Sequence, residues 1–364
     1  MRAAVLVGFG GPEALVIRDD VPVPVPAADE VLIEVRACGV NNTDVNTRIG
    51  WYSGGVASGT PDRTTVEAVD AESGWSGRGF RLPRIQGADV CGHVVAVGSD
   101  ADAALLGRRV LVDPWRRDPD EPDNRELAGY LGSDYDGGFA EYCAVPAANA
   151  YPIDSALTDE ELATFACSWS AAEHMLQRVG LAAGQTIAVT GASGGVGSAL
   201  VGLAKRRAAQ VVAVAGRAKA GQVLELGADR VVTRGDGAVD DAVAANGGPF
   251  DVVADVVGGE QFMGWLGALR RGGRYVTSGA IAGPVVPLDL RTLYLKDLEL
   301  VGATVFGPQV FADLVGYIER GEVRPALAGT YPLERIHEAQ EVFGRKEHVG
   351  SFVITIRDRS APSR

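Results

Sequence analysis

The sequence predicts an α/β protein in which a β-rich part precedes a doubly wound parallel sheet. Its 364 residues are long for one domain and indicate two. Short strands and turns dominate residues 1–35, whereas strands further along alternate with helical stretches. A helix is expected over 157–167, with Thr158 as N-cap and Glu161 at capping-box distance, and later strands are expected at 251–255, 274–278 and 298–302. A glycine-rich turn at residues 190–198 joins a strand to a helix, and such a turn marks the ligand-binding edge of this kind of sheet.

The glycine-rich turn has the spacing of a phosphate-binding loop. An apolar run of strand length covers residues 186–190, and helical spacing follows over residues 198–207. Between them stands Ala192-x-Gly194-x-x-Gly197, with alanine in place of the first glycine of the usual fingerprint. A second strand at residues 210–215 completes a βαβ unit. We expect a Rossmann-type dinucleotide site here, because the helix start offers unpaired N–H groups to a pyrophosphate. The expected contacts are Ala192, Ser193, Gly194, Gly195, Val196 and Gly197.

The end of the second strand predicts the cofactor. An acidic residue there would bind the ribose hydroxyls of NAD, whereas a cation accommodates the 2′-phosphate of NADP. The sequence has Gly216 followed by Arg217 and Lys219, with no carboxylate at the strand tip. These residues favour NADPH, although the two cations could also be ordinary solvated surface charges.

Composition excludes several classes of function. The chain is 46% hydrophobic and 22% charged, which is typical of a soluble globular protein. Its net charge of −13 disfavours a nucleic-acid surface. No apolar run approaches the roughly 20 residues of a membrane span, and the start lacks a signal-peptide pattern, so we expect a cytoplasmic protein. The cysteines are scattered without C-x-x-C spacing, which predicts reduced thiols: Cys38, Cys91, Cys143 and Cys167.

Several motifs occur in the order of one known family. They are Ala37-Cys-Gly-Val-Asn-Asn-Thr-Asp44, Gly87-Ala-Asp-Val-Cys-Gly-His-Val-Val-Ala-Val-Gly98, the glycine turn and a closing segment at residues 332–354. Over nearly its whole length the chain resembles the medium-chain dehydrogenase/reductase superfamily, and most closely its zinc-free, quinone-oxidoreductase-like branch. The resemblance implies a GroES-like β-rich catalytic domain (1–156 and 304–364) and a Rossmann NADP-binding domain (157–303).

The resemblance also implies further contacts and a partner. Strand ends near the nicotinamide half of the cofactor are expected at Val257 and at Ser278, Gly279 and Ala280. Residues 284–297 correspond to a crossover loop that takes part in dimer pairing in relatives, so a homodimer is expected.

The ligands of a catalytic zinc can be compared position by position. Zinc enzymes of the superfamily carry a Cys where this chain has Asn41 and a His where it has Ala88. Only Cys167 stands at a ligand position, and one soft ligand cannot hold Zn²⁺. His93 is displaced from the ligand position and is expected to be a core or hydrogen-bonding residue. We therefore expect no metal.

Three residues are candidates for catalysis without a metal, all by family resemblance. Asn41 and Thr43 are placed to donate hydrogen bonds to a substrate oxygen, and the phenol of Tyr52 to donate a proton. Each also has a structural alternative: Asn41 could satisfy backbone groups, Thr43 could cap a helix and Tyr52 could pack. Asp44 is expected to fix the local loop, and Cys167 to be a remnant of the metal cage.

The expected activity is NADPH-dependent reduction of quinones or of the C=C bond of α,β-unsaturated carbonyl compounds. Two alternatives stay open: a cofactor-binding protein of low turnover with a sensor or structural role, and a metal-independent alcohol or ketone oxidoreductase of a biosynthetic pathway. Two long stretches depart from the family pattern. Residues 49–82 are aromatic enough to favour a substrate-covering loop over disorder, and the charged run at 115–130 is expected to be a solvated face.

Overall fold

The computed structural model describes residues 1–53, 56–60 and 80–356. Within them, a seven-stranded sheet runs in the order β10-β6-β5-β3-β18-β17, with β9 also paired to β3, and a three-stranded sheet runs β2-β1-β4. The strands are β1 (Ala3–Leu6), β2 (Leu15–Arg18), β3 (Glu30–Val40), β4 (Arg84–Ile85), β5 (Asp89–Val97), β6 (Arg109–Val112), β9 (Tyr142–Pro146), β10 (Ala150–Pro152), β17 (Leu327–Pro332) and β18 (Ser351–Thr355). A short ribbon pairs β7 (Trp115–Arg116) with β8 (Gly129–Tyr130).

A parallel sheet forms the second part of the molecule, in the order β13-β12-β11-β14-β15-β16. Its strands are β11 (Thr186–Val189), β12 (Gln210–Ala215), β13 (Arg230–Thr233), β14 (Phe250–Asp255), β15 (Leu269–Thr277) and β16 (Glu299–Gly302). The strand order reverses between β11 and β14, and a doubly wound sheet binds its ligand at such a reversal. The predicted fold class, a GroES-like β-rich part with a Rossmann-type sheet, is confirmed.

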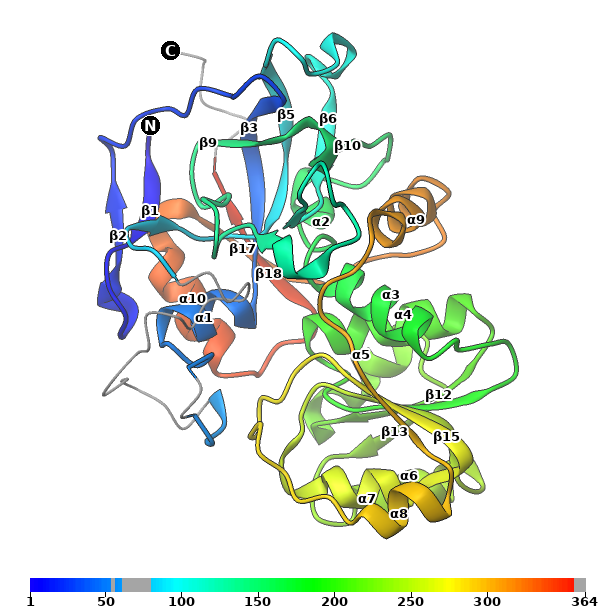
Figure 1. Ribbon diagram of the computed structural model, residues 1–364. Coiled ribbons are helices and arrows are strands. Elements are labelled where there is room, and N and C mark those ends of the chain that lie inside the picture. The colour runs from blue at the N-terminus through cyan, green and yellow to red at the C-terminus, as the bar shows by residue number, and fades with distance from the viewer. Residues whose placement is uncertain (54–55, 61–79, 357–364) are drawn as a thin grey trace.

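Ten α-helices accompany these sheets in the described part of the chain. They are α1 (Asn42–Arg48), α2 (Asp159–Leu162), α3 (Ser168–Arg178), α4 (Gly195–Arg206), α5 (Ala220–Glu225), α6 (Ala238–Asn246), α7 (Phe262–Gly267), α8 (Leu290–Leu295), α9 (Pro308–Glu319) and α10 (Ile336–Gly344). Figure 1 shows the parallel sheet in the lower part, with α3 and α4 above it and α6 and α7 below. The C-terminal strands return to the upper part, where β18 pairs with β3. The domain boundaries predicted above remain our proposal.

The predicted elements differ from the observed ones mainly in length. The predicted capping box is present at α2: the Glu161 N–H donates to Thr158 Oγ1 at 3.2 Å, and Thr158 N–H donates to the Glu161 carboxylate at 2.8 Å. The helix expected over 157–167 is nevertheless confined to α2, because the chain tightens into i→i+3 turns after Leu162. The strand expected over 274–278 begins already at Leu269. In the part of the chain described here, no helix has the length and apolar character needed to cross a membrane.

We expect Phe311 to contribute strongly to stability. It lies on α9, is fully buried, and its ring centroid is 5.0 Å from that of Tyr151. Phe311→Ala should lower the free energy of unfolding by about 3–5 kcal/mol, since it leaves a cavity in the core. The matched change at a surface position, Leu106→Ala (Leu106 is 56% exposed), should cost at most about 0.5 kcal/mol. Denaturant unfolding measures both, and equal losses would contradict the packing described.

Candidate functional site

The turn after β11 is held in a conformation that requires glycine. Gly191 has a φ of 58°, and a Cβ on Gly197 would lie 2.1 Å from the Gly191 carbonyl oxygen. Gly194 caps α4 in an extended conformation without a side chain of its own. The start of α4 thus presents bare backbone to the cavity beside it, as a diphosphate requires.

A cavity of about 720 Å³ opens at this turn. All but two of the predicted site residues line it: Asn41, Thr43, Tyr52, Ser193, Gly194, Gly195, Val196, Gly197, Gly216, Lys219, Val257, Ser278, Gly279 and Ala280. The other two are Ala192 and Arg217. Ala192 is fully buried, and its N–H donates to the Val214 carbonyl at 3.1 Å, so it packs beneath the turn against β12. Arg217 is exposed and lies outside the lining.

One end of the cavity, next to Gly216, is positively charged. Lys219, Arg234 and Lys346 line it, and the Lys219 ammonium donates to the Lys346 carbonyl at 2.8 Å. Burial, reinforced by the Lys219 charge, lowers the pKa of Lys346 to about 7. The ion pairs found among the described residues do not include these three cations. Within the described ranges no carboxylate pairs with Lys219 or Arg234, so this end of the cavity is suited to an anionic ligand.

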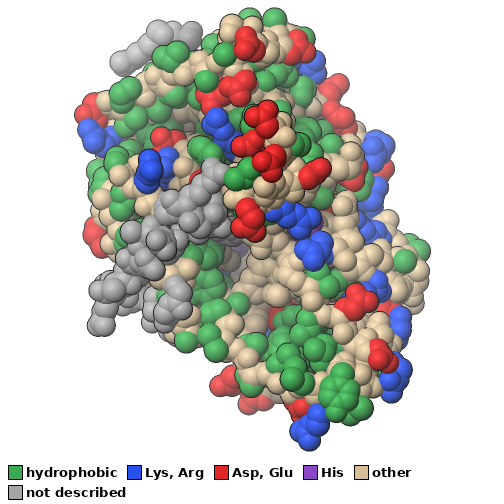
Figure 2. Space-filling view, viewed as in Figure 1, with side chains coloured by type: hydrophobic (Ala, Val, Ile, Leu, Met, Phe, Trp, Pro, Cys, Tyr) green, Lys and Arg blue, Asp and Glu red, His purple; other side chains and the backbone are tan. Residues whose placement is uncertain are grey.

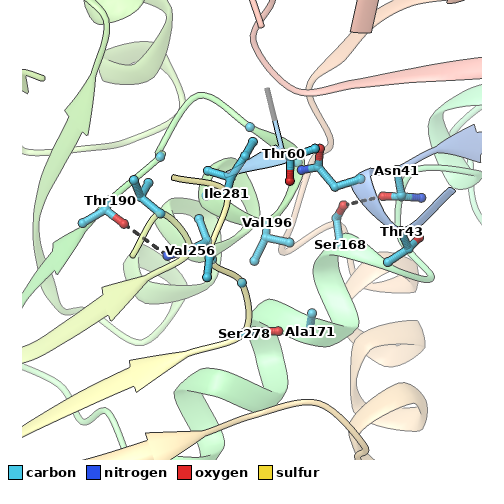
Figure 3. Close-up of a pocket in the computed structure, with 18 of the residues that line it drawn as sticks. Asn41, Thr43, Thr60, Ser168, Ala171, Thr190, Val196, Val256, Ser278 and Ile281 are labelled. Atoms are coloured by element: carbon cyan, nitrogen blue, oxygen red, sulfur yellow. Dashed lines mark hydrogen bonds between the residues drawn. The ribbon is translucent and has the colours of Figure 1, made fainter. Parts of the chain in front are cut away.

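At the other end, Asn41 is held by its neighbours. Its Nδ2 donates to Asp89 Oδ2 at 2.6 Å, and its Oδ1 accepts from the Ser168 hydroxyl at 3.1 Å (Figure 3). The other Asp89 oxygen accepts the N–H of Cys167. Burial raises the pKa of Asp89 to about 6 despite these hydrogen bonds. Asp89 therefore joins the Asn41 amide to the backbone at Cys167.

Hydroxyl and thiol groups line the cavity beside the Asn41 amide. Thr43 Oγ1 is buried, lines the cavity and has no hydrogen-bond partner of acceptable geometry among the described residues. The Cys167 thiol lies beside Thr43 and Tyr130, and burial together with Asp89 raises its pKa. Burial also raises the pKa of Tyr52, whose side chain is hydrogen-bonded to Asn46. At neutral pH this end of the cavity therefore offers neutral phenol and thiol groups.

Asp44 fixes its loop, as expected. Its carboxylate accepts the N–H of Asn41 at 2.7 Å, and burial raises its pKa to about 7. Ala88 is buried and carries no donor atom, and His93 lies on β5 outside the cavity lining. Over the described ranges, no three His, Cys, Asp or Glu side chains are grouped in a way that could hold a metal ion.

Two family models match the chain: the alcohol dehydrogenase GroES-like domain over residues 27–155 and the zinc-binding dehydrogenase over residues 195–320. A quinone oxidoreductase of Lama guanicoe is 30% identical over 94% of this chain and 93% of its own. A solved structure of a candidate alcohol dehydrogenase from Sinorhizobium meliloti 1021 is 49% identical, with a TM-score of 0.89, and covers 98% of this chain and 96% of its own. The chain belongs to the medium-chain dehydrogenase/reductase superfamily. The relatives named above are oxidoreductases, and the predicted combination of a GroES-like part with a Rossmann-type part is confirmed.

A more distant member is informative about ligands. The 2-octenoyl-CoA carboxylase reductase CinF, solved with NADP and 2-octenoyl-CoA, is 25% identical with a TM-score of 0.82 and covers 97% of this chain and 87% of its own. CinF therefore holds a nicotinamide cofactor and an unsaturated acyl-CoA at the same time.

Several residues that line the cavity were not predicted from the sequence. Arg234 follows β13 directly, at the same carboxyl edge of the sheet as Gly216. Its position just after a strand could have indicated that it belongs to the cavity. The others come from distant segments and had no local signal: Ser168, Thr60, Trp115, Tyr130, Phe306, Lys346, His348 and Ser351.

The predictions for the two long stretches, residues 49–82 and 115–130, have different outcomes. Most of the expected substrate-covering loop, residues 54–55 and 61–79 with Trp75, lies outside the described residues, although Trp51, Tyr52 and Thr60 line the cavity. The expectation of a solvated face over 115–130 is wrong for Arg117. Its guanidinium pairs with the buried Asp113 at 2.7 Å and donates to the Phe306 carbonyl at 2.9 Å, which fixes one wall of the cavity.

Proposed function

We propose that this chain is an NADPH-dependent reductase of quinones or of the C=C bond of α,β-unsaturated carbonyl compounds, working without a metal. One observation carries the proposal: a single cavity joins a cluster of cations (Lys219, Arg234 and Lys346), a glycine turn and a neutral amide–hydroxyl cluster. The first two suit a phosphorylated dinucleotide, and the third suits an oxygen that gains negative charge. The name of the Lama guanicoe relative and the ligands of CinF support the same reading.

The cations support NADPH over NADH. Lys219 and Arg234 flank Gly216, where the adenosine ribose of a Rossmann-bound dinucleotide is expected. A dianionic 2′-phosphate would offset the repulsion by which Arg234 contributes to lowering the Lys219 pKa, after the larger effect of burial. Lys346 from the C-terminal part has a pKa lowered to about 7 by burial, and a bound phosphate would favour its protonated form.

The residues present do not fit a catalytic zinc. Both functional atoms of the Asn41 amide are engaged by Asp89 and Ser168, Ala88 has no donor, and the Cys167 thiol has a raised pKa. Zinc needs three protein ligands, with any cysteine as a thiolate. We therefore derive no step through a metal.

Hydrogen-bond donors take the place of the metal in our mechanism. Bound NADPH would supply a hydride to the β-carbon of the substrate. Thr43, whose side chain lies beside the Cys167 thiol in the cavity lining, is the donor we assign to the conjugated oxygen, where charge develops. The Asn41 amide donates one N–H to Asp89. We assign the second N–H of that amide to the same substrate oxygen. Tyr52 remains a phenol at neutral pH, because burial raises its pKa, and we assign it the proton for the α-carbon.

We also propose that the partner is a second copy of this chain. Strand β16 is an edge of the parallel sheet, and the neighbouring residues expose apolar side chains: Val285, Leu290, Tyr294, Leu295 and Leu300. Figure 2 shows hydrophobic side chains gathered at the lower end of the molecule, which carries α8 in Figure 1. An unpaired edge beside an apolar surface is suited to pairing with an identical edge.

Turnover tests the proposed activity directly. Wild-type protein should oxidise NADPH in the presence of quinones or enones, and Thr43→Val should lower kcat/KM about 10²–10³-fold, since it removes a donor to the developing oxyanion. Thr43→Ser keeps the hydroxyl and should retain most of the activity. Tight NADPH binding with no turnover across the panel would instead favour a low-turnover cofactor-binding protein.

Cofactor preference tests the cation cluster. Lys219→Ala and Arg234→Ala should each raise the KM for NADPH about 10–100-fold, the worth of one charge-assisted hydrogen bond, while the KM for NADH stays within about twofold. Arg230→Ala is the control, because Arg230 is an exposed cation at the start of β13, at the opposite end of that strand from Arg234. A wild-type preference for NADH would refute this assignment.

Metal analysis tests the absence of zinc from the reaction. Purified active protein should contain less than about 0.1 zinc per chain, because three ligands are needed and one is present. Turnover should be unchanged after dialysis against a chelator. One zinc per active chain, lost together with activity, would overturn the metal-free mechanism.

Light scattering tests the homodimer. The wild type should have twice the mass of the chain, and Leu295→Asp should shift it toward the monomer by placing a charge in the apolar contact. Leu106→Asp changes an equally exposed leucine away from α8 and should leave the mass unchanged. A monomeric wild type would reject the proposal.

A further inference from the structure

The carboxylate of Asp255 lies at the switch point of the parallel sheet and accepts hydrogen bonds from three directions. Oδ1 accepts from the Thr190 hydroxyl at 2.5 Å, and Oδ2 accepts from the Tyr275 hydroxyl. The residue ends β14, while Thr190 follows β11 and Tyr275 lies on β15, so the carboxylate ties three adjacent strands. Asp255 is buried, with 1% of its surface exposed.

The same carboxylate holds the loop that follows β14. The N–H of Val257 donates to Oδ1 at 2.7 Å, and the N–H of Gly258 lies 3.2 Å from both oxygens. Thr190 supports the loop as well, because its hydroxyl oxygen accepts the Val256 N–H at 3.2 Å (Figure 3). Val256, Val257 and Gly258 all line the cavity. Asp255 therefore determines where this part of the cavity wall lies.

A second loop rests on the first. The Ala282 N–H donates to the Val257 carbonyl at 2.8 Å, and the Gly259 N–H donates to the Gly283 carbonyl at 3.2 Å. Gly258 has a φ of 64°, and a Cβ there would come within 2.9 Å of the Gly283 oxygen, so the loops fit together without spare room. Across the cleft, the Thr60 N–H donates to the Ile281 carbonyl at 2.9 Å. Figure 3 shows Thr60 and Ile281 beside each other.

We propose that Asp255 is the positioning residue for the nicotinamide half of the cofactor, acting through loops 256–259 and 278–283. The adenosine half is expected at the other end of the cavity, beside Gly216, Lys219 and Arg234, and none of these contacts Asp255 through a hydrogen bond described here. Loss of Asp255 should therefore weaken binding of the nicotinamide half while leaving binding of the adenosine half intact. The proposal rests on the proposed cofactor-dependent function.

The same strand provides a matched control. Asp251, near the amino end of β14, also bridges to β11 through a threonine: it accepts from Thr186 N–H at 2.8 Å and from the Thr186 hydroxyl at 3.1 Å. Asp251 therefore makes the interstrand tie that Asp255 makes but lies at the end of the sheet away from the cavity. Any purely structural cost of losing an Asp–Thr tie should appear at both positions.

Calorimetric titration of the full-length protein distinguishes the two roles. The ligands are NADPH and 2′,5′-ADP, which has the phosphorylated adenosine end and lacks nicotinamide. Asp255→Asn presents an N–H₂ group to donors and should raise the Kd for NADPH at least about 10-fold, with the Kd for 2′,5′-ADP unchanged within about twofold. In Asp251→Asn both constants should stay within about twofold. Thermal unfolding of the two variants measures their shared structural loss.

Equal weakening of NADPH and 2′,5′-ADP in Asp255→Asn, or equal behaviour of the two variants, would overturn the positioning role. If Asp255→Asn does not fold, Tyr275→Phe and Thr190→Val each remove one donor and keep the carboxylate. A few-fold rise in the Kd for NADPH with an unchanged Kd for 2′,5′-ADP supports the proposal. Equal changes in the two Kd values reject it. If the wild type prefers NADH, the cofactor assignment fails separately, and the comparison is made with NADH and ADP instead.

Discussion

Close approach of the backbone at the turn after β11 is the constraint on which the site depends. Gly197 must lie against the Gly191 carbonyl with no room for a Cβ, and this contact sets where α4 begins. The residues of that helix start line the cavity, where their N–H groups are suited to a diphosphate. Alanine at position 192 is compatible with this geometry, because that residue points beneath the turn and packs against β12.

The turn is completed by segments that are remote in sequence. A Cβ on Gly195 would meet the hydroxyls of Ser168 and Ser351 at 2.5 and 3.2 Å, so α3 and β18 close over the start of α4. The Gly350 N–H donates to the Ser193 carbonyl at 2.9 Å, and a Cβ on Gly350 would collide with Ala326. The C-terminal segment therefore packs on the glycine turn, and it brings Lys346 to the charged end of the cavity.

Buried carboxylates organise both ends of the opposite wall. Asp89 holds the Asn41 amide and the Cys167 backbone, and Asp255 holds the loop at Val257 and Gly258. In each case an acceptor-only group gathers donors that would otherwise be buried without partners, which costs about 1–3 kcal/mol each. The Asn41 amide and the loop at Val257 and Gly258 are thus held in the cavity wall by carboxylates that lie outside its lining.

The sequence by itself determined the parts that depend on neighbours along the chain. Strands β11, β12, β14, β15 and β16, the capping box at Thr158, the glycine turn and the cation at Lys219 all follow from local spacing and conformational preference, whereas β13 was not predicted. Only the tertiary structure decided which side chains share the cavity: it brought in Arg234 and Lys346, left Arg217 outside and drew Arg117 inward to Asp113. Local patterns encode φ, ψ and burial periodicity. Lys219 meets Lys346 across 127 positions and Arg117 meets the Phe306 carbonyl across 189, and such contacts exist only once the sheets have packed.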